Sequence, residues 1–201
     1  MLSDCANPAT TQGPRPVLAI VSGLPATGKT TLANLLKRDL RWPLFSKDGF
    51  KELLFDADHQ VREGFRREDS IRAGAQAIAI VFQAAAEVLA TGHPCIIEAN
   101  FLPQFAPADL KPLIKEADLR QVHCSVPDDV VVERYLGRAK RGERHPVHTD
   151  LEALDNLLLR MAQGAGEPMP LEAPLFRVDT SHGYAPAPES ILEFLRAPST
   201  T

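Results

Sequence analysis

The sequence predicts an α/β fold in which helices cover both faces of a five-stranded parallel sheet, a three-layer α/β/α sandwich. Short apolar runs of strand length alternate along the chain with longer amphipathic stretches, an order that is typical of strand–helix–strand units. The first runs are apolar without alternation, as expected of strands that are buried on both faces of a sheet. A glycine-containing loop separates the first strand from the first helix. These three observations predict the fold class.

The first elements surround that loop. Residues 17–21 are an unbroken apolar run and predict the first strand. Residues 29–40 place four leucines on one side of a predicted helix. Residues 43–46 predict a short second strand, and a helix through residues 50–55 follows it. Residues 56–68 are polar and weakly patterned, so no element is predicted there.

A long helix and a capped helix are the clearest features of the remaining chain. Residues 69–90 carry an apolar stripe at helical spacing, and Gly92 ends that helix. Thr149 and Glu152 have the spacing of a capping box, which predicts a helix that ends near Gly164. The other predicted elements are strands at residues 95–99, 120–126 and 175–179, and helices at residues 107–117, 127–140 and 187–196.

Chain length and the N-terminal segment predict the domain organisation. The chain has 201 residues, which suits one domain with a single core. Residues 1–15 lack the basic start and the apolar stretch of a signal peptide, and their polar composition predicts a disordered tail. Residues 16–197 are then a single domain. No run of 18 apolar residues occurs, so no membrane-spanning segment is expected.

Charge and cysteine content narrow the function and the compartment. The net charge is −4 with a pI of about 5.9, which argues against nucleic acid as the partner because binding to phosphate backbones needs clustered Lys and Arg. Cys5, Cys95 and Cys124 have no metal-ligand spacing. Cys95 and Cys124 lie in or beside apolar runs, so buried reduced thiols and a cytoplasmic location are expected.

The loop after the first strand has the sequence of a phosphate-binding loop. Gly23 and Gly28 allow the backbone to curl so that its N–H groups point inward, and the following helix aims its positive end at the same point. Lys29 can then reach the β- and γ-phosphates, and the Thr30 hydroxyl can ligate Mg²⁺. The motif, in this strand–helix context, predicts a P-loop NTPase fold that binds ATP and Mg²⁺. The predicted nucleotide-binding residues are Gly23, Leu24, Pro25, Ala26, Thr27, Gly28, Lys29, Thr30 and Thr31.

Asp48 directly follows the second predicted strand. In an open α/β sheet, ligands bind beyond the carboxyl ends of the strands, so Asp48 is placed where an acceptor hydroxyl would meet the γ-phosphate. A carboxylate there can accept the hydroxyl proton and orient the attack. The alternative is that Asp48 only caps the helix that follows. Position alone favours neither.

The glycine loop, residues 46–51 and residues 97–101 together resemble one group of P-loop kinases. The group includes the chloramphenicol phosphotransferases, the zeta toxins and the kinase domain of polynucleotide kinases, and the resemblance covers residues 17–181. In that group an acid after the second strand handles the acceptor hydroxyl, often with a basic residue three positions later. Asp48 and Lys51 match this spacing, although the usual basic residue is Arg. The guanidinium group, which can donate two parallel hydrogen bonds, is therefore replaced here by a single ammonium group.

The tip of the third strand also carries the resemblance. The group commonly has Asp-Ala-Thr-Phe there, and this chain has Glu98, Ala99, Asn100 and Phe101. The resemblance implies that Glu98 holds Mg²⁺, directly or through water, and that Asn100 contributes to substrate binding. The alternative for Glu98 is a strand-end acid that backbone N–H groups satisfy. The resemblance further implies that residues 179–182 edge the adenine pocket.

Arginines after the fourth strand predict a lid. Arg134, Arg138 and Arg141 share one helical face, and Arg144 follows closely. They look like the lid of a small kinase, about residues 134–148, whose arginines cover the phosphates and neutralise charge that develops during transfer. The alternative is a solvated basic face that pairs with Glu133 and Glu143. This small helical lid completes the predicted fold.

The predicted function is an ATP-dependent phosphotransferase that moves the γ-phosphate of Mg-ATP to a hydroxyl of a small molecule. Its predicted catalytic residues are Lys29, Asp48, Arg138 and Arg141. One alternative is a polynucleotide 5′-kinase or a zeta-like nucleotide-sugar kinase, and a second is a nucleotide-binding regulator or ATPase that phosphorylates no acceptor. The sequence does not predict the acceptor or the oligomeric state. Two alternatives are open for five phenylalanines, which either wall an acceptor pocket or belong to the core: Phe50, Phe55, Phe65, Phe101 and Phe105.

Overall fold

The computed structural model describes residues 14–58, 65–103 and 106–198. Most of the predicted N-terminal tail, together with Cys5 and Phe105, lies outside these residues. The strands are β1 (Val17–Ser22), β2 (Leu44–Ser46), β3 (Cys95–Glu98), β4 (Asp118–Ser125) and β5 (Leu175–Asp179). The helices are α1 (Lys29–Leu40), α2 (Lys47–Ala57), α3 (Arg67–Ala90), α4 (Ala106–Ile114), α5 (Asp128–Lys140), α6 (Asp150–Ala162) and α7 (Pro188–Arg196), with a 3₁₀ turn, η1 (Pro146–His148).

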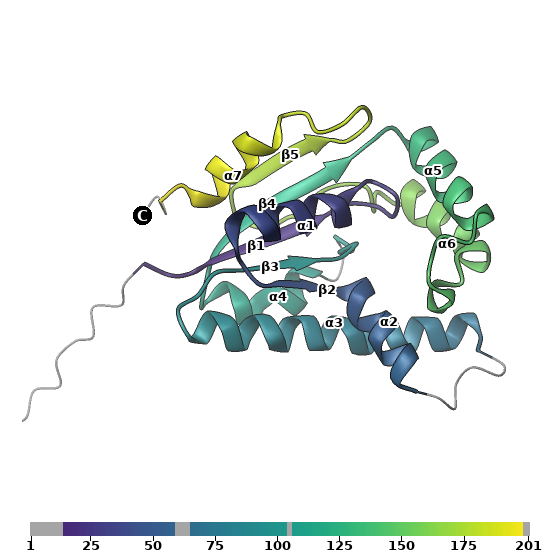
Figure 1. Ribbon diagram of the computed structural model, residues 1–201, viewed down its shortest axis with the longest axis horizontal. Coiled ribbons are helices and arrows are strands. Elements are labelled where there is room, and N and C mark those ends of the chain that lie inside the picture. Colours follow the sequence, from purple (N-terminus) through teal and green to yellow (C-terminus); the bar gives the residue numbers. More distant parts are fainter. Residues whose placement is uncertain (1–13, 59–64, 104–105, 199–201) are drawn as a thin grey trace, which may run out of the picture.

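The five strands form one parallel sheet in the order β2-β3-β1-β4-β5. Figure 1 shows α1 and α7 over one face, α2, α3 and α4 over the other, and α5 with α6 beyond one end of the sheet. The predicted three-layer sandwich with a five-stranded parallel sheet is therefore confirmed. β1 lies between β3 and β4, so the strand that precedes the phosphate loop is the central strand of the sheet.

Alternation along β1 explains why helices cover both faces of the sheet. Leu18 and Ile20 are fully buried in a core cluster that includes residues of α3 and α4. Ala19 and Val21 are fully buried in a second cluster, with residues of α1 and α7. Since successive side chains of a strand point to opposite faces, an unbroken apolar run requires two apolar layers.

A third, smaller cluster lies away from the sheet. Leu24 of the phosphate loop packs there with Val131 and Tyr135 of α5 and Leu157 of α6. The two helices at the end of the sheet thus have an apolar contact of their own and share it with the phosphate loop.

The start of α6 differs from the prediction. Thr149 adopts a left-handed backbone with φ 48°, and its side chain makes no capping hydrogen bond, so the predicted capping box is wrong. The cause is the preceding 3₁₀ turn: Thr149 is the residue that ends it, and its N–H bonds to the Pro146 carbonyl in a left-handed backbone conformation. The Thr149 hydroxyl instead accepts a hydrogen bond from Arg67 at 3.4 Å.

Among the described helices, α3 alone has the length and apolar composition of a membrane-spanning segment, with 24 residues and a mean hydropathy of 1.5 in its most apolar window. One such helix is weak evidence, because a core helix of a soluble protein passes the same test. Here Val81, Ala85 and Leu89 of α3 pack into the core cluster on one face of the sheet. Part of this apolar helix is therefore core, although only 28% of its most apolar window is buried.

Candidate functional site

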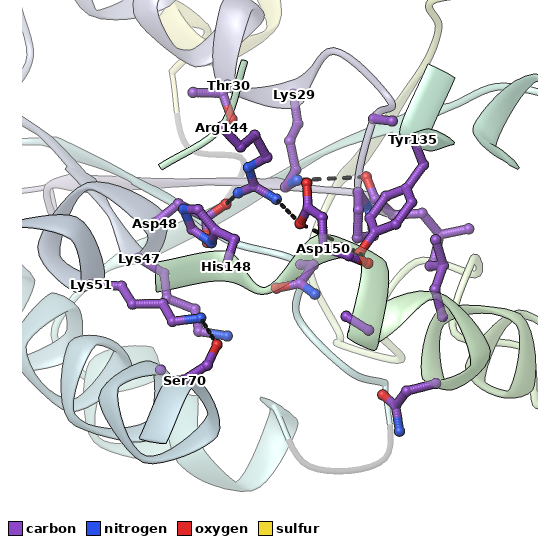
Figure 2. Close-up of a pocket in the computed structure, with 18 of the residues that line it drawn as sticks. Lys29, Thr30, Lys47, Asp48, Lys51, Ser70, Tyr135, Arg144, His148 and Asp150 are labelled. Atoms are coloured by element: carbon purple, nitrogen blue, oxygen red, sulfur yellow. Dashed lines mark hydrogen bonds and ion pairs between the residues drawn. The ribbon is translucent and has the colours of Figure 1, made fainter. Parts of the chain in front are cut away.

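A cavity of about 660 Å³ opens at the carboxyl ends of the central strands. The phosphate loop forms one wall, α2 and α3 form another, and α5, η1 and α6 close the remaining side. Figure 2 shows Lys29 and Thr30 on one side of this cavity and Lys47, Lys51 and Ser70 on the other, with Asp48 and Arg144 between them. The position agrees with the general rule for open α/β sheets, in which ligands bind beyond the strand ends.

The phosphate loop is held in a curled conformation by its own contacts. Gly23 has φ +140°, and a Cβ on it would lie 2.3 Å from the carbonyl oxygen of Cys124. Gly28, at φ +76°, ends the loop at the first residue before α1. The Thr27 hydroxyl donates to the Leu24 carbonyl at 2.8 Å, and the Thr180 hydroxyl donates to the Thr27 carbonyl at 2.7 Å. Contacts within the protein thus hold the phosphate loop in its curled conformation.

Glu98 gathers two hydroxyl groups and the loop lysine. Its carboxylate, only 1% exposed, accepts hydrogen bonds from Thr30 Oγ1 at 3.2 Å and from Ser46 Oγ at 2.6 Å. Lys29 Nζ lies 3.7 Å from Glu98 Oε1. The alternative for Glu98, an acid satisfied only by backbone N–H groups, does not fit these side-chain contacts.

The donor set around Glu98 fits Mg²⁺. A hydroxyl and a carboxylate in contact are hard oxygen ligands, and Mg²⁺ usually keeps several waters and needs only one or two protein groups beside phosphate oxygens. Within the described ranges, no group of three or more His, Cys, Asp or Glu side chains could hold a metal ion. Thr30 and Glu98 are therefore the residues that would hold Mg²⁺ here, together with phosphate oxygens of a bound nucleotide.

Ser46 is a site residue that the sequence analysis did not identify. It is the N-cap of α2, where its Oγ accepts from the Gly49 N–H at 3.4 Å, and the same hydroxyl orients Glu98. A serine three residues before Gly49, at the end of a strand, has the residue type that N-caps prefer. That preference could have identified the cap, but not the contact with Glu98.

Asp48 lies in the first turn of α2, where Ser46 is the N-cap, so the capping alternative for Asp48 is wrong. Asp48 Oδ2 is 2.5 Å from Nη2 of Arg144. Burial alone would raise the pKa of Asp48, but the charges of Arg144 and Lys29 outweigh it and hold the pKa well below its ordinary value. Asp48 is thus a carboxylate at neutral pH, aimed into the cavity.

Of the four arginines predicted to form a lid, Arg144 and Arg138 reach the cavity. Arg144 also donates to Asp150 Oδ1 at 3.2 Å, and Arg138 Nη2 is 3.7 Å from Asp150 Oδ2. The Tyr135 hydroxyl donates to the Asp150 backbone carbonyl at 2.9 Å. Arg138 Nε and Nη2 are buried and have no hydrogen-bond partner within the described structure. Buried cationic donors without acceptors mark a place that suits an anion such as phosphate.

Arg134 and Arg141 lie elsewhere. Arg134 donates to the carbonyls of Thr180 and Ser181 at 3.1 and 2.8 Å, so it anchors the loop after β5. Arg141 is exposed and pairs with Glu143. The prediction that Arg141 covers the phosphates is therefore not supported by its position, and the alternative of a solvated pair describes it. The helix ends at Lys140, so the helical spacing no longer directs this side chain.

The far side of the cavity is polar and cationic rather than aromatic. Lys51 is 7% exposed and donates to Ser70 Oγ at 2.7 Å, and burial lowers its pKa to about 8. Asn100 lines the same cavity, as predicted from the strand tip. None of the four described phenylalanines considered for this pocket lines it; Phe101, for example, stacks on Phe82 in the core. The apolar residues that do line this side are Ile71, Ala75, Ile78 and Leu102.

His148 and His123 are buried histidines. His148, in η1, hydrogen-bonds Glu52 Oε1 at 2.7 Å, and burial together with Arg144 lowers its pKa to about 3. His123 lies between the Ser22 hydroxyl, at 3.0 Å, and the Gly166 carbonyl, at 2.9 Å. His148 is therefore neutral and belongs to the cavity wall.

Comparison with known proteins identifies a family and a fold. A family described as AAA domain matches residues 18–163. A solved structure of a candidate kinase from Chloroflexus aurantiacus is 38% identical with a TM-score of 0.80, and the match covers 92% of this chain and 100% of that one. Among proteins of curated function, none matches significantly.

Two more distant structures share the fold. A chain of the Pnkp1/Rnl/Hen1 RNA repair complex is 19% identical with a TM-score of 0.52, and the match covers 80% of this chain and 50% of that one. The APS kinase of Mycobacterium tuberculosis, solved with AMPPNP and APS, is 19% identical with a TM-score of 0.56; 92% of this chain and 100% of that chain are covered. At this identity they establish the fold alone.

Proposed function

The chain belongs to the AAA-domain family that matches residues 18–163, and from that premise we propose that it is an ATP-dependent kinase of a small-molecule hydroxyl group. The observation that carries the proposal is the placement of two chemically different groups in one cavity. A phosphate loop with its Thr30–Glu98 contact lies on one side, and the carboxylate of Asp48 faces it from the second strand end. A nucleotide-binding regulator would need only the first.

The loop side accounts for nucleotide binding. The inward N–H groups, the start of α1 and Lys29 offer positive charge to the β- and γ-phosphates. Mg²⁺ at Thr30 and Glu98 would supply charge neutralisation of the phosphate oxygens. Nε and Nη2 of Arg138, which make no hydrogen bond in the described structure, can donate to the transferring phosphoryl group, where negative charge is spread over the equatorial oxygens.

Asp48 and Arg144 account for the acceptor. While Arg144 pairs with Asp48, the carboxylate is a weak base, because its ionised form is stabilised. A phosphoryl group next to the lid offers Arg144 a second anion, and movement of Arg144 toward it frees Asp48 to accept the acceptor's proton. Asp150 keeps Arg144 within reach of both positions. Lys51 and Asn100 line the same side and complete the acceptor contacts.

We further propose that residues 16–197 are one kinase domain, that residues 134–148 are part of its lid and that it works in the cytoplasm. The small cluster of Leu24, Tyr135 and Leu157 supports a lid that packs partly on the phosphate loop. Cys95 and Cys124 are buried free thiols, and burial raises the pKa of each to about 12, so they are inert. Reduced thiols of this kind suit the cytoplasm.

The test is ADP release with Mg-ATP across a panel of small hydroxyl compounds, in the native protein and in Asp48→Asn. We expect acceptor-dependent turnover that falls at least 100-fold in Asp48→Asn, as for loss of a general base, while the affinity for ATP stays within about threefold. Asp155→Asn, which removes an exposed carboxylate of α6, is the matched control and should behave as the native protein. Equal turnover in Asp48→Asn would refute the assigned role of Asp48. ATP binding with no acceptor turned over would favour the regulator, and preference for a 5′-hydroxyl oligonucleotide would favour the polynucleotide kinase.

A further inference from the structure

Cationic side chains outnumber carboxylates around the cavity, although the chain as a whole has a net charge of −4. The lining carboxylates in the described structure are Asp48, Glu52 and Asp150, and the lining cations are Lys29, Lys47, Lys51, Arg67, Arg138, Arg144 and Arg160. This concentration of positive charge is therefore local, and it exceeds what one bound nucleotide needs on the loop side.

Each lining carboxylate already has a partner. Asp48 pairs with Arg144, Asp150 pairs with Arg144 and Arg138, and Glu52 accepts a hydrogen bond from the neutral imidazole of His148. On the loop side, Lys29 lies beside Glu98. Four cations thus have no carboxylate partner within residues 14–58, 65–103 and 106–198: Lys47, Lys51, Arg67 and Arg160.

These four cations gather on the acceptor side. Lys51 donates to Ser70 of α3. Lys47 lies beside Gly74, one turn further along α3: its Nζ is 3.7 Å from the position that a Cβ on Gly74 would occupy. Figure 2 shows Lys47, Lys51 and Ser70 together, on the far side of Asp48 from Lys29 and Thr30. Arg67, one turn before Ser70, also faces this side.

Arg160 closes the group from the opposite helix, α6. Burial, followed by the charge of Arg67, lowers the pKa of Arg160, and burial also lowers the pKa of Lys47, with Arg160 among the charges that add to it. Like charges brought together without a counter-ion destabilise one another. An anion bound among them would remove that cost, so the arrangement is one that a ligand completes.

We propose that the acceptor is a small alcohol that carries an anionic group, a phosphate or a carboxylate, and that Lys47, Lys51, Arg67 and Arg160 bind this group while the hydroxyl faces Asp48. The inference rests on the kinase function proposed above and names its substrate class. The apolar side chains of Ile71, Ala75 and Ile78 beside these cations suit the carbon skeleton between the two polar ends. A neutral sugar or polyol would leave the four cations without a counter-charge.

The first experiment compares matched acceptors in the ADP-release assay. The pairs are glycerol with glycerol 3-phosphate, glucose with glucose 6-phosphate, and glucose with gluconate, so that phosphate and carboxylate are tested separately. We expect turnover only with anionic members. Lys47→Gln and Arg160→Gln should raise KM for the anionic acceptor by about 10- to 100-fold, the effect of one charged hydrogen bond, with KM for ATP changed less than about threefold. Lys37→Gln, which removes an exposed cation of α1, is the control.

A second experiment decides the question if none of these alcohols is turned over. Inorganic phosphate is titrated into the protein saturated with Mg-AMPPNP, and binding is measured by calorimetry. Binding that is weakened at least tenfold in Arg160→Gln and in Lys47→Gln, but not in Lys37→Gln, supports the anion subsite even where the kinase function fails. Absent binding, or binding that these variants leave unchanged, overturns it. Efficient turnover of neutral alcohols overturns it while the kinase function stands, and preference for an oligonucleotide overturns the small-molecule class.

Discussion

Ser46 offers the sharpest test of how the site is held together, because one hydroxyl has two separable roles. It caps α2 by accepting from the Gly49 N–H, and it donates to the buried carboxylate of Glu98 at 2.6 Å. Replacing an N-cap serine by alanine costs about 1 kcal/mol, and a hydrogen bond to a charged group contributes about 1.5–3 kcal/mol. We therefore expect Ser46→Ala to lower the free energy of unfolding by about 2–4 kcal/mol.

A second substitution separates the two roles. Glycine at an N-cap costs only a few tenths of a kcal/mol, so Ser46→Gly keeps most of the cap and loses the bond to Glu98. Its expected destabilisation is about 1.5–3 kcal/mol, slightly less than that of alanine. Urea unfolding measures both values, and an unchanged slope with denaturant would show that the unfolded state is not altered.

A double-mutant cycle with Glu98→Ala then isolates the bond. If Ser46 acts on Glu98 as described, the coupling energy is about 1.5–3 kcal/mol. Additive effects of the two substitutions would mean that the hydroxyl does not orient Glu98. A loss below about 0.5 kcal/mol in Ser46→Ala would mean that it neither caps α2 nor orients Glu98, and either result would refute the reasoning. Thr91→Ala removes an exposed hydroxyl that bonds the end of α3 and serves as control.

Three further predictions concern the loop, the lid and Lys51. Gly23→Ala places a Cβ against the Cys124 carbonyl oxygen, so calorimetry should show Mg-ATP binding weakened at least tenfold, whereas Gly92→Ala, with open space around it, should leave binding intact. Arg138→Ala should lower kcat by at least about 100-fold in the ADP-release assay and Arg141→Ala by less than about twofold, because only Arg138 faces the cavity; similar losses in both would contradict the lid geometry. Burial lowers the pKa of Lys51 to about 8 from its ordinary 10.5, so the folded state holds this proton less tightly than the unfolded state. Between about pH 8 and 10.5, the free energy of unfolding should therefore rise by about 1–3 kcal/mol more in the native protein than in Lys51→Met. Urea unfolding measures this difference, and parallel pH profiles of the two proteins would exclude a lowered pKa of Lys51.

The parts of the molecule that could be predicted from the sequence are those in which neighbouring residues act together. The phosphate loop is one contiguous segment, and the strand before it and the helix after it are read from local periodicity. The predicted strands agree with β1 to β5 within a few residues. The order β2-β3-β1-β4-β5 then brings the ends of β1, β2 and β3 together, so Thr30, Asp48 and Glu98 share one edge of the sheet.

The parts that could not be predicted depend on partners far apart in the chain. Arg144 is 96 residues from Asp48, and because Arg141 and Arg144 both follow the end of α5, helical spacing does not tell which of them meets the carboxylate. Thr149 has the spacing of a capping residue, but the same turn sets its backbone in a left-handed conformation. Ser46 is recognisable as a cap and not as the partner of Glu98, because that contact joins two strands.

The two hydrogen bonds from Arg134 to the loop after β5 have a mechanical consequence. That loop is itself tied to the phosphate loop through Thr180, so this point of α5 is fixed to the nucleotide side of the molecule. These bonds oppose sliding of the helix as a whole, so a movement of α5 would be a rotation about Arg134. With a rise of 1.5 Å per residue, Arg138 is about 6 Å from the pivot and Lys140 about 9 Å, so a rotation of about 20° moves them by about 2 and 3 Å. Arg144 lies four residues beyond the end of α5, so a small tilt at Arg134 would be enough to displace it from Asp48.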